Sequence, residues 1–203
     1  DRMSDDGFFD EFDQVIFYGA GPCGYAAAAF SVAAPGARVL VVQPQATLSP
    51  DRAEWDNRFT DMRRLDFTDR YGYAPDMLEA AEHAWLIYDP CQSEDAMHAS
   101  LFAGENTTRL RARHMGAAVQ TDLLDMGILL PLIDACAQNT LTAQRFAHLL
   151  RARREHLPFL RRLLEHLDRE GQDTRARVLC ESVTARMNAP RLAKRLTQLQ
   201  NAS

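Results

Sequence analysis

The residues most suggestive of chemistry form a glycine-rich stretch that follows the apolar run QVIFY at residues 14–18. Gly19, Gly21 and Gly24 have the spacing G-x-G-x-x-G. In dinucleotide-binding proteins the first glycine makes a tight turn, the second lets a pyrophosphate approach the backbone, and the third allows close helix packing. Pro22 suits this context because proline is preorganised for the first helical turn. One hypothesis is therefore an oxidoreductase fragment that binds FAD or NAD.

Other features expected of a dinucleotide site are missing from the sequence. An acidic residue that holds the ribose hydroxyls should end the second strand, but Gln43 stands there, followed by Pro44. No further glycine-rich cofactor segment follows Gln43. The dinucleotide hypothesis is therefore kept as the alternative, and our preferred interpretation includes no cofactor.

The same turn also fits a nucleophile elbow, G-x-S-x-G, with Gly21 at its apex. Such an elbow needs a strand, a sharp turn and a helix, with small residues around the nucleophile. In α/β-hydrolases an acidic residue and then a histidine follow along the chain. Here Asp89 and Asp95 follow the third predicted strand, and His114 follows the fourth. These three residues are the candidate partners of an elbow nucleophile.

Each of these partners also has a simpler interpretation. Asp89 precedes Pro90 and could cap a turn, while Asp95 could interact with the dipole at the start of a helix. His114 is either a working base or a relic that is hydrogen-bonded to a carboxylate. The sequence leaves these alternatives open.

Several longer phrases are distinctive: VIFYGAGPCGYAAAAFSVAAPGARVLVVQPQATLSP, WDNRF, LDFTDRYGYAPDMLEAAE, LIYDP, DAMHASLF and RHMG. Over almost the whole chain they resemble a bacterial family of α/β-hydrolase-like proteins. Its members usually show Y-G-A-S-M-G-G-Y at the elbow and end in an Arg-rich helical region. They often carry an automatic label of phosphoadenosine phosphosulfate reductase, but this chain has no S-G-G-x-D-S type pyrophosphate loop.

The chain departs from this family where chemistry would occur. Gly21 replaces the elbow serine and has no side chain to attack a substrate, and Pro22 has no N–H to stabilise an oxyanion. Losing one oxyanion donor costs about 2.7–4 kcal/mol of transition-state stabilisation, and losing the nucleophile removes covalent catalysis. We therefore expect a pseudoenzyme that binds a small molecule or a protein partner. A third hypothesis is an acyl hydrolase in which Cys23 is a relocated nucleophile.

Strands and helices alternate along the first two thirds of the chain, which predicts a parallel α/β sheet of about four strands in sequential order. The expected strands cover residues 14–18, 37–42, 84–88 and 107–112. The expected helices cover residues 22–34, 76–83, 93–102 and part of 121–138. An edge strand at residues 14–18 would be exposed, so we expect that the chain is truncated at its N-terminus or that its first residues cover this edge.

A long polar and aromatic segment, residues 44–75, interrupts this alternation. It contains Trp55, Phe59, Tyr71 and Tyr73. These aromatic side chains are expected to anchor the segment over the sheet, and the alternative is a platform on which a sugar stacks.

The last third of the chain has a different character. Residues 1–141 carry 10 basic and 22 acidic side chains, whereas residues 142–203 carry 13 basic and 6 acidic ones. Helices are expected at residues 142–154, 157–169, 172–187 and 189–200. The sequence thus predicts an α/β domain at 1–141 and an Arg-rich helical region at 142–203. We interpret its arginines as a solvated face and expect no nucleic-acid partner.

Composition excludes several other classes. With 46% hydrophobic and 25% charged residues, the chain is neither disordered nor fibrous. No run of 18 apolar residues is present, so no membrane span and no membrane partner are expected. The four cysteines, at positions 23, 91, 136 and 180, are too far apart for a CxxC metal or redox pair. Reduced thiols in a cytoplasmic protein are expected.

Overall fold

The structure is a computed structural model that describes residues 7–201. The chain divides into two compact units, Asp1–His148 and Leu149–Ser203. Within the described range, no helix has both the length and the apolar character needed to cross a membrane.

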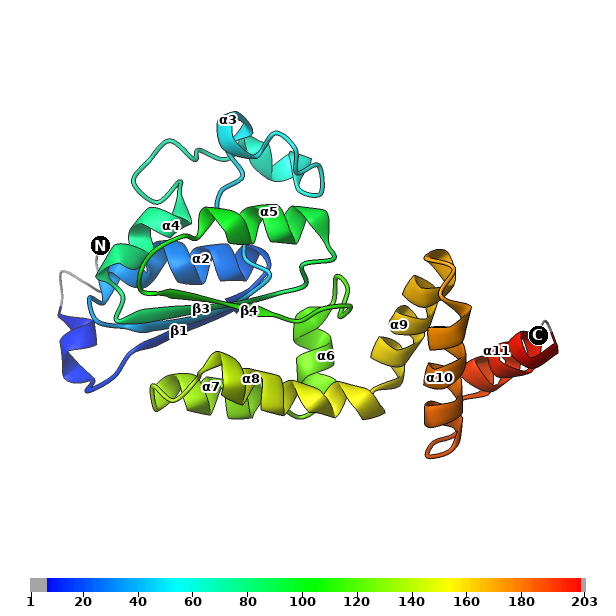
Figure 1. The fold of residues 1–203 in the computed structure, drawn as a ribbon. Coiled ribbons are helices and arrows are strands. Elements are labelled where there is room, and N and C mark those ends of the chain that lie inside the picture. Colours follow the sequence, from blue (N-terminus) through cyan, green and yellow to red (C-terminus); the bar gives the residue numbers. More distant parts are fainter. Residues whose placement is uncertain (1–6, 202–203) are drawn as a thin grey trace. The chain divides into compact units, whose positions relative to one another are not determined.

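The first unit is built on a four-stranded, all-parallel sheet whose strands lie in sequence order (Figure 1). The strands are β1 (Ile16–Ala20), β2 (Arg38–Val42), β3 (His83–Tyr88) and β4 (Thr107–Arg111). The central strands β2 and β3 are almost continuously apolar and buried, as expected of strands that are covered on both faces. The predicted fold class, a sequential parallel sheet with flanking helices and a helical C-terminal region, is confirmed.

Helices cover both faces of this sheet. The helices of the first unit are α2 (Pro22–Phe30), α3 (Pro50–Ala53), α4 (Ala74–Met77), α5 (Ser93–Leu101), α6 (Val119–Asp125), α7 (Leu129–Ala137) and α8 (Ala143–Leu149). Helices α2, α4 and α5 lie on one face, and α7 lies on the other (Figure 1). The small side chains of Ala27, Ala28 and Ala29 are buried in the core with Val39 and Val41 of β2, so α2 can lie close to the sheet.

Two regions expected to be helical differ from the prediction, each for a local reason. The helix expected at residues 76–83 begins earlier, at Ala74, because Pro75 is tolerated in the first helical turn. After a 3₁₀ turn it gives way to extended backbone, and His83 opens β3 instead. The helix expected within 121–138 is split into α6 and α7 by Gly127, which has a φ of +69°.

The first strand lies two residues further along than expected. Gly19 and Ala20 belong to β1 because they pair with Val41 and Val42 of β2. Glycine has a low intrinsic preference for strands, but pairing with the neighbouring strand overrides it. The turn that carries the glycine motif therefore starts directly at the carboxyl end of β1.

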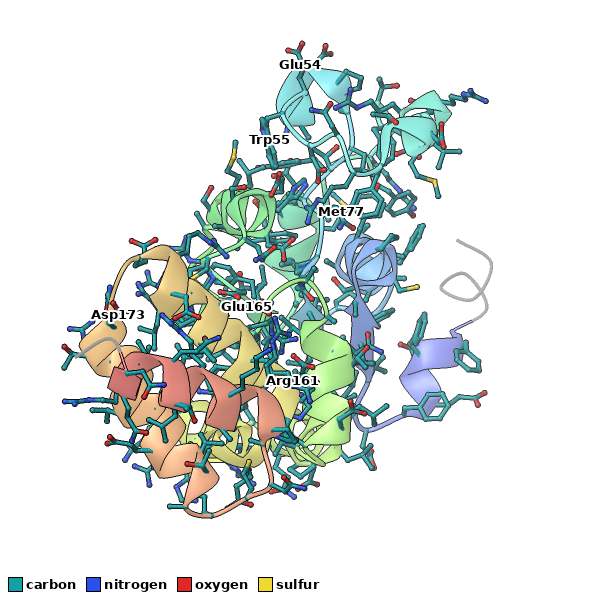
Figure 2. All side chains as sticks on the ribbon, turned by 90° about the vertical axis from the view of Figure 1, so that its right-hand side faces the viewer. Glu54, Trp55, Met77, Arg161, Glu165 and Asp173 are labelled. Atoms are coloured by element: carbon teal, nitrogen blue, oxygen red, sulfur yellow. The ribbon has the colours of Figure 1, made fainter. Side chains whose placement is uncertain are left out.

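The second unit contains α9 (Leu157–Arg169), α10 (Asp173–Thr184) and α11 (Pro190–Asn201), preceded by a 3₁₀ segment at Leu150–Glu155. Leu160, Leu164 and Leu167 form the buried face of α9. Glu165 of α9, labelled in Figure 2, forms an ion pair with Arg191 of α11 at 2.9 Å. Apolar burial along α9 therefore stabilises this unit more than its exposed ion pairs do.

Candidate functional site

The glycine turn between β1 and α2 has a conformation that suits glycine. Gly21 lies at its apex with φ +54° and ψ −127°, in the left-handed half of backbone space that other residues adopt only with strain. Its N–H donates to the Val42 carbonyl at 2.9 Å, and its carbonyl accepts the Tyr25 N–H at 3.1 Å. A Cβ at Gly21 would meet no atom within 4 Å. A side chain at this apex would therefore point into open space.

The other two glycines of the motif allow close approach of the backbone. A Cβ on Gly19 would lie 2.1 Å from the backbone oxygen of Cys23, and one on Gly24 would lie 3.2 Å from Cβ of Pro44. The first distance leaves no room for any side chain at Gly19. Tight packing of this kind is required by an elbow and by a dinucleotide turn alike, so these glycines do not separate the two hypotheses.

A cavity of about 320 Å³, hereafter the turn cavity, adjoins Gly21. It lies beyond the carboxyl ends of β1 and β2, the edge at which parallel α/β sheets commonly bind ligands. Its lining consists of Ala20, Gly21, Gln43, Gln45, Arg58, Phe59, Asp95, Ala117, Ala118, Gln120 and Thr121.

Gln43 occupies the position at which a dinucleotide site would have its acidic residue. Its Oε1 accepts the Val119 N–H at 3.0 Å, and its Nε2 donates to an Asp95 carboxylate oxygen. The amide thus joins the end of β2 to the start of α6 and to α5. Since both ends of the amide are engaged within the protein, Gln43 acts here as a structural link.

The cavity wall also contains a charge network in which the partly exposed Arg58 binds two buried carboxylates. The guanidinium donates through Nη1 to Asp95 at 2.6 Å and through Nη2 to Asp56 at 2.8 Å. Burial alone would raise the pKa of Asp56, but hydrogen bonds from Arg58 and His98 lower it to about 2. Both aspartates are almost fully buried, so each needs these donors to satisfy its carboxylate oxygens.

His98 of α5 completes this network on the side away from the cavity. Its Nδ1 accepts the Ala46 N–H at 3.2 Å, so the ring proton is on Nε2, which donates to Asp56 at 2.9 Å. Burial lowers the pKa of His98, which keeps the imidazole neutral. The Trp55 ring packs against it at a centroid distance of 4.5 Å and lies between α3 and α5 (Figure 2). His98 therefore fastens the 44–75 segment to α5.

The two candidate acids belong to different clusters. Asp89, which is fully buried, accepts backbone N–H groups from Cys91 at 2.9 Å, His114 at 3.1 Å and Gly116 at 2.7 Å. It thereby joins the loops that follow β3 and β4. Asp95 instead bonds Arg58 and lines the turn cavity.

The structure brings together a thiol and an imidazole that the sequence did not pair. His114, with φ +62°, places Nδ1 3.6 Å from Sγ of Cys91. Burial and the charge of Asp89 raise the pKa of the Cys91 thiol. The two residues are 23 positions apart, and they meet because β3 and β4 are neighbours with aligned carboxyl ends.

The predicted catalytic residues do not converge on one point. Among the described residues, the lining of the turn cavity includes Gly21 and Asp95 but not Asp89, His114 or Cys23. Cys23 is exposed in the first turn of α2. The turn cavity can therefore hold a ligand beside Gly21. The imidazole of His114 instead contacts Cys91, in the loop that follows β3.

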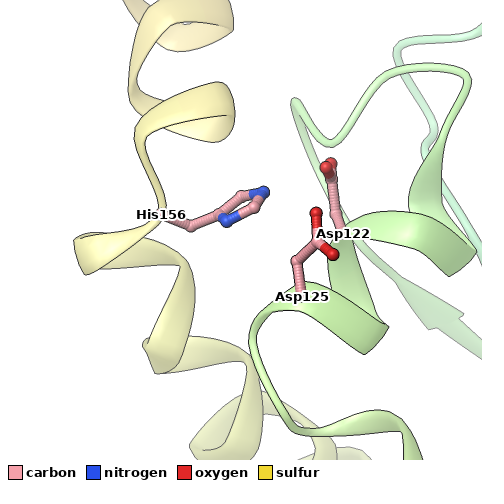
Figure 3. Close-up of side chains that lie close together, drawn as sticks. All are labelled: Asp122, Asp125 and His156. Carbon is pink, nitrogen blue, oxygen red and sulfur yellow. The ribbon is translucent and has the colours of Figure 1, made fainter.

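Helix α6, whose first turn contributes to the cavity, also carries two carboxylates at Asp122 and Asp125 (Figure 3). They are three residues apart and so lie on one side of the helix. Two carboxylates fall short of the six to eight oxygen ligands that Ca²⁺ takes, and we assign no metal to them.

Comparison of the chain with protein-family models, with curated proteins and with solved structures finds no match. The function is therefore argued from the geometry and chemistry of the site.

Proposed function

We propose that the first unit is an α/β-hydrolase-like module that binds a small polar molecule at the turn cavity without covalent catalysis. The observation that carries this proposal is Gly21. It occupies the apex of a sharp strand-to-helix turn, where an elbow would hold its nucleophile, and it has no side chain to present to the adjoining cavity.

The order of the strands supports this proposal over a dinucleotide site. A hydrolase-like sheet places the elbow strand, the next strand, the acid-bearing strand and the histidine-bearing strand side by side in sequence order. A dinucleotide fold would instead place its first strand centrally, with a later crossover returning to its other side. In the sheet of the described residues, β1 lies at one edge and β4 at the other. Gln43, moreover, offers no carboxylate to a ribose.

Two further features argue that the elbow is inactive. Pro22 is the first residue of α2, so the residue after the apex cannot donate an N–H to a developing oxyanion. The His114 imidazole contacts Cys91 Sγ, and His114 is outside the described lining of the cavity. A nucleophile at the apex would therefore lack both its oxyanion donor and a base within the cavity.

A hydrolysis assay tests this proposal directly. Purified protein should not hydrolyse p-nitrophenyl acetate above the rate of a heat-denatured sample, and Cys23→Ala and Cys91→Ala should not change that result. Turnover that disappears in Cys23→Ala would favour the relocated nucleophile, and turnover that disappears in Cys91→Ala would move the chemistry to the Cys91–His114 pair. Either result would overturn the proposal.

The double substitution Gly21→Ser with Pro22→Met probes the ancestry of the turn. It restores a hydroxyl at the apex and a backbone N–H after it. We expect little or no ester hydrolysis from this variant or from Gly21→Ser alone, because neither change supplies a base to the described lining of the cavity. Any gain of turnover in the double variant over Gly21→Ser would support an elbow whose geometry survived, since only the double variant regains the N–H. Flavin absorbance of the purified protein would contradict this assignment and favour the dinucleotide alternative.

A further inference from the structure

One buried acceptor in the wall of the turn cavity has no partner. The Gln45 side chain lines the cavity and is only 2% exposed. Within the part of the chain that the structure describes, its Oε1 accepts no hydrogen bond. Buried side-chain acceptors are satisfied in the large majority of cases, so each exception calls for a specific explanation. A rotation of the Gln45 side chain that turns this buried amide toward the cavity would let an O–H or N–H of a ligand satisfy the oxygen.

The two charged side chains that line the cavity, Arg58 and Asp95, form an ion pair with each other. Arg58 contributes one positive charge, and its guanidinium is shared between Asp56 and Asp95. Asp56 is further satisfied by the neutral His98. An anionic ligand would therefore find a cation that two carboxylates already engage, and a cationic ligand would find carboxylates that are already bonded. This wall suits an uncharged ligand.

The remaining polar groups of the lining are neutral. Gln120 and Thr121 offer an amide and a hydroxyl, which both donate and accept hydrogen bonds. Phe59 adds an aromatic ring to the same wall. Neutral hydrogen-bonding groups beside one aromatic ring suit a molecule that carries many hydroxyls on an apolar carbon frame.

Phe59 lines the cavity, whereas three other aromatic residues of the 44–75 segment pack against side chains elsewhere. The Trp55 ring packs on His98, Tyr73 lies under the guanidinium of Arg52 at 4.2 Å, and Tyr71 lies 5.0 Å from the Phe30 ring. Their roles are to anchor the segment. Of these four aromatic residues, Phe59 alone is in the described lining of the cavity.

We propose that the turn cavity binds an uncharged polyhydroxy compound, a sugar or sugar alcohol, one hydroxyl of which donates to Oε1 of Gln45. This inference rests on the proposed function, since it names the ligand class of the same non-covalent site. The absent side chain at Gly21 leaves room for the ligand beside the apex, because a Cβ there would meet no protein atom. A volume of about 320 Å³ is at the lower end of ligand pockets and fits a molecule of monosaccharide size.

Ligand-observed NMR by saturation transfer tests this assignment. The probes are D-ribose, D-glucose and D-sorbitol, with D-gluconate and D-glucose 6-phosphate as charged counterparts. We expect a saturable signal from at least one neutral probe, and weaker binding of the charged probes. Gln45→Met should weaken that binding roughly tenfold, the loss expected for one buried hydrogen bond. The same substitution should leave the melting temperature unchanged or higher, because it removes an unsatisfied oxygen.

A matched pair of glycine variants separates occupancy of the cavity from backbone strain. Gly21 and Gly36 both have positive φ, +54° and +81°, and a Cβ on either would meet no atom within 4 Å. Gly21→Ala adds a methyl group beside the cavity, whereas Gly36→Ala adds one outside its lining. Binding should weaken in Gly21→Ala and stay unchanged in Gly36→Ala, although both substitutions place alanine at a positive φ.

Three results would overturn this assignment: no neutral probe binds, the charged probes bind as tightly as the neutral ones, or Gln45→Met leaves binding unchanged. None of these three binding results bears on the proposed loss of the elbow nucleophile, which is tested separately by ester hydrolysis. Turnover of the ester would instead remove the proposed function while leaving any measured sugar affinity intact. The two failures are therefore distinguishable.

Discussion

Nη1 of Arg58 lies 2.6 Å from Oδ1 of Asp95, and this contact joins the 44–75 segment to the first turn of α5. The guanidinium also lines the turn cavity. Arg58 thus has two roles, as the counter-ion of two buried carboxylates and as a part of the candidate ligand site.

Replacing Arg58 with methionine should destabilise the first unit by about 2–3 kcal/mol. The change leaves Asp56 and Asp95 buried without their cation, and breaking a buried pair in this way costs about 3–5 kcal/mol. We expect a smaller value because the Arg58 side chain is 34% exposed, so water can partly compensate. Urea denaturation gives the free energy of unfolding, and Arg64→Met, at an exposed position of the same segment, is the control. Equal effects of the two substitutions would contradict the role of Arg58.

Stability should fall as the pH drops from about 4 to about 2. Asp56 has a folded-state pKa of about 2 against an ordinary value of 3.8. Because the pKa is depressed in the folded state, the stabilisation is present above the unfolded-state pKa and is lost as the pH approaches the folded-state one. The loss amounts to about 2 kcal/mol. Denaturation curves at several pH values check this, and Asp56→Asn should flatten the slope in that range.

A separate loss of stability is expected as the pH falls below about 6.5, the ordinary pKa of histidine. Burial lowers the pKa of His98, so protons bind more readily to its unfolded form, and acidification favours unfolding. His98→Gln should weaken this dependence while keeping an amide that can donate to Asp56; His83, whose pKa burial also lowers, accounts for a further part. An unchanged pH profile below 6.5 in His98→Gln would show that another group is responsible.

Alanine should destabilise the protein more at Gly19 than at Gly21. Gly19→Ala forces a Cβ to within 2.1 Å of a backbone oxygen, which no side-chain rotation can relieve, and should cost about 3 kcal/mol or more. Gly21→Ala meets open space and should cost less, about 1–3 kcal/mol, the strain of a non-glycine residue in a sparsely populated backbone region. Thermal unfolding compares the two variants. A larger loss in Gly21→Ala would contradict the observed turn geometry.

Alkylation should distinguish the four cysteines in the native protein. Cys23 and Cys91 are exposed, whereas Cys136 and Cys180 are buried. Burial also raises the pKa of Cys136 to about 12, which leaves almost no reactive thiolate near neutral pH. Mass spectrometry after iodoacetamide treatment should find two modified sites in native protein and four in urea. His114→Ala should change the alkylation rate at Cys91 and leave that at Cys23 unaltered.

The sheet could be predicted because its strands are short apolar runs bounded by turns, as at residues 84–88. The end of the first strand cannot be predicted in the same way, since Gly19 joins β1 only through pairing with β2. The sequence also led to the turn cavity, because Gly21 and Gln43 were singled out at the ends of the first two strands. It did not identify Gln45 or Arg58, which lie in a segment without helical or strand periodicity.

Contacts between residues far apart in the sequence also could not be predicted. Cys91 and His114 come together only once the order of β3 and β4 is known. Asp89 was correctly placed after the third strand, but the sequence could not tell that three backbone N–H groups hold its carboxylate. Composition and spacing cannot specify such hydrogen-bond partners, because each contact depends on the conformation of the loops that follow β3 and β4.

The double engagement of Arg58 links the turn cavity to a segment of more than thirty residues. A molecule that rests against the guanidinium also restrains the backbone that carries it, so occupancy should slow amide hydrogen exchange across residues 44–75. The segment would then act as a reporter of the bound state, readable by deuterium uptake even for a ligand with no absorbance or fluorescence of its own.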